Sequence, residues 1–135
     1  ISSVWQVASC EIGVDVMQDV SGEHDGRAIE LCIAKTLNAA RFEFTPSASL
    51  SWMSSKMTGY LYGVSSREAR ADRGMYTPDD SWELELELMV QRPIRGNWTA
   101  VGVTGFSTYG EAIRDSPIVD EDYSYQLVLG IMYSF

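Results

Sequence analysis

Three segments of this sequence alternate apolar and polar residues with a period of two: 41–53, 82–91 and 123–135. In the second segment an apolar set alternates with three glutamates, namely Trp82, Leu84, Leu86, Leu88 and Val90 with Glu83, Glu85 and Glu87. Successive side chains of a β-strand point to opposite faces, whereas a helix repeats every ~3.6 residues and would mix the two kinds. The pattern therefore predicts an all-β fold whose strands have one apolar and one polar face.

Four weaker segments complete the expected sheet, at 4–16, 28–35, 58–64 and 98–109. The last has mixed faces, because Val101 and Val103 alternate out of phase with Trp98 and Phe106. Short, turn-like connections separate several segments, at 21–26, 54–56 and 93–96. Two connections are long and charged, 65–81 and 110–122. We expect an antiparallel up-and-down sheet of about seven strands, with residues 1–135 in a single domain.

Composition excludes several classes of protein. Of the 135 residues, 45% are hydrophobic and 21% are charged, as in a folded domain. The formal net charge of -9 argues against a nucleic-acid partner. No run approaches the roughly 20 apolar residues of a membrane-spanning helix, but a strand of a membrane barrel needs only ~9–11.

The two cysteines do not indicate a metal site. Cys10 and Cys32 lack zinc-type spacing, and the single histidine, His24, lies outside any ligand pattern. We expect two free thiols, with a disulfide as the open alternative, and neither a metal nor a cofactor.

The alternation alone does not say where the apolar face points. A soluble barrel of the lipocalin or avidin type turns it inward, whereas an outer-membrane barrel turns it toward lipid. Aromatic residues gather at strand ends, as in the interfacial girdles of membrane barrels: Phe42, Phe44, Trp52, Trp82, Tyr123 and Tyr125. We therefore favour a transmembrane barrel of the outer-membrane type, with Leu84, Leu86, Leu88, Leu127, Leu129 and Ile131 facing outward.

The end of the chain has the form of an assembly signal. It finishes in Phe135, with Tyr133, Ile131 and Leu129 at every second position before it. Such a terminus resembles the signal that bacterial outer-membrane barrels present to the barrel assembly machinery. The expected partners thus include that machinery, with outer-membrane lipid and lipopolysaccharide.

Strand parity assigns each connection to a side of the membrane. If the last strand ends in the periplasm, 65–81 and 110–122 are external, while 21–26, 54–56 and 93–96 are periplasmic. The first strand then starts outside, whereas a complete barrel starts inside. We therefore expect at least one further strand upstream, which makes residues 1–135 the C-terminal portion of a longer barrel.

Several motifs, taken in order, resemble one family. They are the segment 19–26, Phe44-Thr-Pro46 with Leu50-Ser-Trp52, Tyr60-Leu-Tyr-Gly-Val64, Asp115-Ser-Pro-Ile-Val119 and Gly130-Ile-Met-Tyr-Ser-Phe135. Along nearly its whole length the chain resembles the C-terminal half of the MipA/OmpV family of outer-membrane proteins. A departure is Ser134, where the family often has a basic residue.

The resemblance implies a non-enzymatic barrel in the outer membrane of a Gram-negative bacterium. One family member is described as a scaffold that joins a lytic murein transglycosylase to a peptidoglycan synthase. Others are treated as surface antigens or adhesins. The resemblance supplies no catalytic residue.

Two further residue sets are candidates for binding. Parity assigns a group of polar residues to periplasmic contacts with a partner: His24, Asp25, Lys56, Arg92 and Arg95. The family-motif loop contains Asp115, Ser116 and Pro117, which we interpret as a turn that orders an external loop. His24 with Asp25 and Ser21 is a weak candidate for a hydrolase triad, and turn chemistry is the favoured interpretation.

The acidic residues of the polar face support a channel as a second hypothesis. Glu83, Glu85 and Glu87 would line the interior with Glu30 and give it a preference for cations. A solvated polar face is the alternative that we favour. The soluble ligand-binding barrel is the third hypothesis.

Overall fold

A computed structural model describes residues 1–7 and 10–135 of the chain. The strands are β1 (Ser2–Val7), β2 (Cys10–Gln18), β3 (Arg27–Lys35), β4 (Leu37–Ala39), β5 (Phe42–Met53), β6 (Ser81–Arg95), β7 (Trp98–Tyr109) and β8 (Tyr123–Tyr133). The helices are α1 (Ser55–Tyr62) and α2 (Glu111–Arg114). Among the described residues, neither helix has the length and apolarity needed to cross a bilayer.

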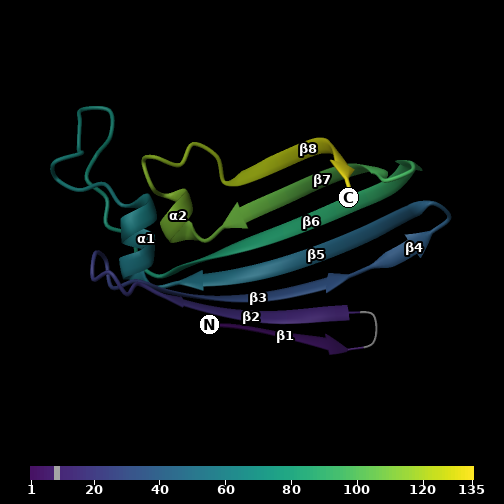
Figure 1. The fold of residues 1–135 in the computed structure, drawn as a ribbon. Coiled ribbons are helices and arrows are strands. Elements are labelled where there is room, and N and C mark those ends of the chain that lie inside the picture. Colours follow the sequence, from purple (N-terminus) through teal and green to yellow (C-terminus); the bar gives the residue numbers. More distant parts are fainter. Residues whose placement is uncertain (8–9) are drawn as a thin grey trace.

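The strands form one antiparallel sheet in the order β1-β2-β3-β5-β6-β7-β8, and the short β4 pairs with β5 beside the end of β3 (Figure 1). Each strand on this path pairs with the next along the chain, which is the up-and-down arrangement predicted from the alternation. The all-β antiparallel prediction is confirmed. In the described part of the chain, β1 and β8 are the two edges and do not pair with each other.

Two of the predicted strands are wrong. The segment 4–16 is a hairpin rather than one strand, with Val4 paired to Gly13 and Trp5 paired to Ile12. Val4 therefore lies on the polar face, opposite to Ile12. Ala8 and Ser9, which the predicted strand contained, lie outside the described residues. The sequence does not locate the reversal, because the turn-type residues of this segment, Gly13 and Asp15, lie within β2 rather than between the two strands.

The predicted strand 58–64 is instead covered largely by the helix α1. Thr58 is fully buried and its hydroxyl donates to the carbonyl of Ser54 at 3.1 Å. In a run of only eight residues, the apolar positions fit both the period of two of a strand and the spacing of three to four of a helix. Tertiary packing therefore determines which structure forms. The two errors offset each other, so the path still contains seven strands.

The register separates the two faces of the sheet. Leu31, Leu50 and Leu84 form one row across β3, β5 and β6, and the next row is Glu30, Ser51 and Glu83. No described element packs on the apolar face, where Leu86 is 45% exposed and Leu127, Leu129 and Ile131 are 69%, 77% and 67% exposed, whereas Ile113 of α2 packs on the polar face. The predicted outward direction of these side chains is confirmed, and it is opposite to that of a soluble barrel.

The small buried core lies on the polar side of the sheet, at one end. Ala28 and Met53, which are on the polar face, pack with Ile113 of α2, which is fully buried. Met57, Tyr62, Tyr109 and Val119 pack around them. Both helices therefore cover the end of the polar face, and they lie beside the ends of β3, β5 and β6 in Figure 1.

The connections are distributed unequally between the two ends of the sheet. We call one end the loop end, with 19–26, 54–80 and 110–122, and the other the turn end, with 40–41 and 96–97. Parity predicted that 21–26 and 54–56 lie on the opposite side from the long loops, and this is wrong. The helix α1 replaces the predicted strand 58–64, so the count from the last strand loses one crossing and both connections lie at the loop end. Of the three predicted periplasmic turns, only the 93–96 connection lies at the turn end.

Candidate functional site

The loop end is an ordered cap rather than a set of free loops. We call its members, 19–26, α1, 63–80, α2 and 115–122, the loop cap. Ile113 is its central buried side chain. Val64 and Tyr76 pair as an antiparallel bridge, and the Tyr76 hydroxyl donates to the carbonyl of Ala112 at 2.9 Å. Burial raises the pKa of the Tyr76 phenol, so it stays protonated and continues to donate.

Asp19 organises the turn between β2 and β3. Its carboxylate accepts hydrogen bonds from the amide and hydroxyl of Ser21 at 2.8 and 2.6 Å, and from the amides of His24 and Asp25 at 2.8 and 3.0 Å. The Ser21 hydroxyl and then the His24 amide are the main groups that lower the pKa of Asp19. The sequence signal was the Asp-x-Ser spacing of a local side-chain turn, but Asp19 was not among the predicted site residues.

His24 is held within this turn and is not part of a triad. Its Nδ1 accepts a hydrogen bond from the amide of Gly26 at 3.0 Å, and its ring stacks on Tyr60 with centroids 4.4 Å apart. The Ser21 hydroxyl donates to Asp19 instead of to His24. The Ser21, His24 and Asp25 arrangement of a hydrolase is therefore not assembled, and the turn interpretation describes these residues.

Lys56 and Asp25 connect α1 to the same turn. Lys56 Nζ lies 3.1 Å from the Asp25 carboxylate, but the two side chains are 61% and 68% exposed. An exposed ion pair contributes only ~0–1 kcal/mol. The firmer connection is Ser54, whose hydroxyl accepts from the Arg27 amide at 2.9 Å and whose amide donates back to the Arg27 carbonyl at 2.9 Å.

The family-motif loop is tied to α1 through Ser116. This residue is 2% exposed, and its hydroxyl donates to the carbonyl of Tyr62 at 2.6 Å. Asp115 ends α2, with its amide donating to the carbonyl of Glu111 at 2.8 Å. Pro117 follows directly in the turn. The motif residues thus lie together in the loop cap and hold it closed.

Carboxylates gather in a hollow of about 640 Å³ at the loop end. Asp79, Asp80, Glu111 and Asp115 line it together with Arg114. The Asp80 carboxylate already accepts from the amide of Ser55 at 2.6 Å. Over residues 1–7 and 10–135, no cluster of three or more His, Cys, Asp or Glu side chains has the geometry to hold a metal ion.

The polar face of the strands is acidic along its length. Glu30, Glu85 and Glu87 line a hollow of about 180 Å³ with Cys32 and neighbouring serines. The hydroxyl of Ser51 donates to Glu30, and the amide of Gln126 donates to Glu85, each at 3.4 Å. The strand positions of this face carry no Lys or Arg in the part of the chain that the structure describes.

The two cysteines lie on opposite faces of adjacent strands. Cys32 pairs with Gly13 and faces the polar side, whereas Cys10 pairs with Lys35 on the apolar side. Both thiols are free. A disulfide between them is excluded by this geometry, because the two side chains point in opposite directions.

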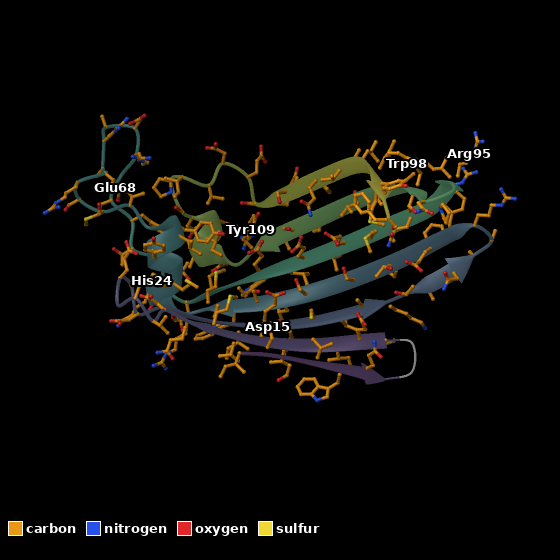
Figure 2. All side chains as sticks on the ribbon, in the orientation of Figure 1. Asp15, His24, Glu68, Arg95, Trp98 and Tyr109 are labelled. Atoms are coloured by element: carbon orange, nitrogen blue, oxygen red, sulfur yellow. The ribbon has the colours of Figure 1, made fainter. Side chains whose placement is uncertain are left out.

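The turn end carries the remaining predicted residues. Figure 2 shows Arg95 beside Trp98 at this end, far along the sheet from His24 and Glu68 at the loop end. Arg92 lies over the ring of Phe42, 5.1 Å from its centroid. His24, Asp25 and Lys56 therefore cannot share one side with Arg92 and Arg95, as parity had predicted, and the set is two groups at opposite ends.

The terminal residues form an aromatic row at the turn end. Tyr133 packs on Trp98 with centroids 4.8 Å apart and on Phe135 with centroids 5.3 Å apart. Leu129, Ile131 and Tyr133 belong to the apolar face and are exposed. The predicted assembly signal is thus a continuous apolar edge of β8.

The fold and its faces define an outer-membrane β-barrel protein: an up-and-down sheet, apolar outside and polar inside, with long connections at one end. Residues 2–135 match the family model described as MltA-interacting protein MipA, and the chain belongs to this family. The resemblance inferred from the motifs is confirmed. No solved structure matches the chain.

The MltA-interacting protein of Escherichia coli K12 is 35% identical over 92 residues, which are 67% of this chain and 37% of the relative. The putative outer membrane protein YiaT of the same strain is 27% identical over 132 residues, 97% of this chain and 52% of the relative. The outer membrane protein OmpV of Vibrio cholerae is 25% identical over 117 residues, which are 87% of this chain and 46% of the relative. The chain spans about half the length of these relatives or less. Membership of this family of outer-membrane proteins places the protein in the outer membrane of a Gram-negative bacterium.

Proposed function

We propose that the protein is a non-enzymatic scaffold of the outer membrane that binds a murein-processing enzyme at its turn end. One support is the relative whose name states that it interacts with MltA, at 35% identity. The resemblance to the family implies a lytic transglycosylase and a peptidoglycan synthase as the partners. The whole protein would close the sheet with strands outside this chain.

The loop cap is the observation that carries the proposal. Ile113 and Tyr62 pack onto Ala28 and Met53 at the end of the polar face. Side chains buried to this degree fill space that an open pore would need. The loop cap therefore favours a scaffold over a freely conducting channel.

The turn end supplies the surface for a periplasmic partner. Short turns face the periplasm in bacterial barrels and long loops face outward. Neither 36–41 nor 92–98 contains an Asp or Glu, whereas Arg41 and Arg95 are exposed there. This surface complements an acidic patch on a partner enzyme and would guide its association.

Binding of a purified lytic transglycosylase to the full-length protein tests the scaffold. We expect the double variant Arg41→Gln/Arg95→Gln to weaken binding about tenfold, mostly at low salt, because exposed charges are screened by salt. The matched control is Lys56→Gln, a charge removed from the loop end. Equal binding by wild type and the double variant, or no binding by wild type, would contradict the proposal.

A cation-preferring diffusion channel is the second candidate. It is favoured by the carboxylates of Glu30, Glu85 and Glu87 on a polar face without basic residues at its described strand positions. Planar-bilayer conductance of the full-length protein separates the two functions. A steady, cation-selective conductance with the loop cap intact would replace the scaffold by the channel.

A further inference from the structure

The outer face of the sheet is not uniformly filled with large side chains. A groove of about 450 Å³ runs along β7, between β6 and β8, and almost all of its lining is apolar. Its floor consists of Ala100, Gly102 and Thr104, which alternate with residues of the polar face. A lipid-facing surface of Leu and Val side chains would have no such hollow, so the floor residues create it.

Larger side chains form the two walls. Val90 of β6 and Leu129 of β8 flank Gly102 in register. The neighbouring row repeats the arrangement, with Leu88 and Leu127 on either side of the floor. An added Cβ at Gly102 would meet Cδ2 of Leu129 at 3.3 Å, so any side chain there enters the groove.

Aromatic residues limit the groove along β7. Trp98, which packs on Tyr133, precedes the floor at the turn end, and Phe106, which packs on Tyr125, follows it. The floor from Ala100 to Thr104 is ~13 Å long at the rise of a β-strand. This is a narrow, elongated apolar shape that fits a hydrocarbon chain lying along the strand.

A cation closes the groove on the turn side. Arg92 lines it and lies over Phe42, which keeps the guanidinium on the outer face. Within residues 1–7 and 10–135, no carboxylate is within ion-pair distance of Arg92. The groove thus joins an apolar trough to a guanidinium without an acidic partner, at the height of the interfacial aromatic residues.

We propose that this groove is a binding site for one membrane glycerophospholipid. One acyl chain lies on Gly102 between Val90 and Leu129, and the lipid phosphate accepts hydrogen bonds from the Arg92 guanidinium. Arginine is suited to this role because its planar group binds phosphate through two parallel donors. The lipid belongs to the leaflet at the turn end, where the connections carry arginine and no carboxylate.

Native mass spectrometry of the full-length protein, released from detergent with dipalmitoyl phosphatidylglycerol, tests the site. The wild type is expected to retain one lipid, and Arg92→Gln and Gly102→Val are each expected to reduce its retention about tenfold. Arg67→Gln, which removes an exposed arginine of the loop cap, is the matched charge control. Gly130→Val is the matched glycine control, because its side chain enters the polar face, where nothing lies within 4 Å. Both controls are expected to retain the lipid as the wild type does.

Three outcomes would overturn the site. One is equal retention by wild type, Arg92→Gln and Gly102→Val. Another is equal retention of dipalmitoylglycerol, which lacks the phosphate. The third is retention of lipopolysaccharide in preference to phosphatidylglycerol. Heat-modifiable migration in gels verifies that each variant is folded. If Gly102→Val fails to fold, the comparison of Arg92→Gln with its arginine control is sufficient for the test.

Discussion

The hydroxyl of Ser116 donates a hydrogen bond to the carbonyl of Tyr62 across 2.6 Å, and it joins two connections that are 54 residues apart in the chain. Through this contact the loop after α2 is fixed to the end of α1. The contact lies over the buried Ile113 and so stabilises the part of the loop cap that fills the end of the polar face.

Replacing Ser116 by Ala should loosen the loop cap without unfolding the sheet. The substitution leaves the half-buried Tyr62 carbonyl without its donor, at a cost of about 1 kcal/mol. Limited proteolysis of the reconstituted protein is expected to cut 110–122 faster than in the wild type. Ser134→Ala, at the exposed end of the chain, is the control. Unchanged protection of the loop in Ser116→Ala would contradict this role.

Acid should release the turn that Asp19 organises. The folded turn lowers the pKa of Asp19 below its ordinary value of 3.8, so the stabilisation is present above that pH. It is lost as the pH falls below the ordinary value toward the lowered one. Hydrogen exchange of the amides of 21–26 is expected to accelerate over this acidic range.

The variant Asp19→Asn removes the titrating charge and should abolish that acid dependence, with faster exchange already at neutral pH. Asp120→Asn, which leaves the turn untouched, should behave as the wild type. An acid response that persists in Asp19→Asn would show that another group controls the turn.

Replacing Phe135 by Ala should impair assembly far more than stability. The side chain is fully exposed and touches only Tyr133 among the aromatic residues, so its loss removes little burial. The expected result is a severalfold lower level of heat-modifiable, protease-protected protein in the outer membrane. Ser134→Ala is the control, and normal levels of Phe135→Ala would refute the assembly signal.

Adjacent residues of β8 should respond oppositely to a charge. Leu129 faces outward and is 77% exposed, whereas Val128 faces the polar side. An arginine near the middle of the lipid-facing surface costs ~2–4 kcal/mol, and one on the inner face meets the carboxylates there. Urea unfolding in lipid vesicles should show Leu129→Arg destabilised by that amount and Val128→Arg close to the wild type. A larger destabilisation by Val128→Arg than by Leu129→Arg would show that the polar face, and not the apolar face, contacts lipid.

Strands β5, β6 and β8 could be predicted because their alternation is long and unbroken. The hairpin at β1–β2 could not, since the turn-type residues Gly13 and Asp15 lie inside β2. The helix α1 could not either, since it depends on tertiary packing that buries Thr58. The strand predicted in place of α1 moved His24, Asp25 and Lys56 to the wrong side.

The groove on β7 could not be predicted from the sequence for a different reason. Its walls and floor depend on the register that places Val90 and Leu129 beside Gly102, and register between strands is a long-range property. Ser116 was recognised as part of a motif, but its partner Tyr62 lies too far along the chain for local reasoning to find.

Quenching of tryptophan fluorescence by brominated lipid tests most directly that the apolar face contacts the membrane. All four tryptophans, Trp5, Trp52, Trp82 and Trp98, lie on the apolar face and are 40–53% exposed. In the full-length protein, with tryptophans outside this chain replaced by phenylalanine, brominated acyl chains should quench most of the emission, while aqueous iodide should quench little. Quenching by neither agent would place the apolar face inside a closed barrel, and strong quenching by iodide with none by brominated lipid would place it in water. Either result would contradict the account.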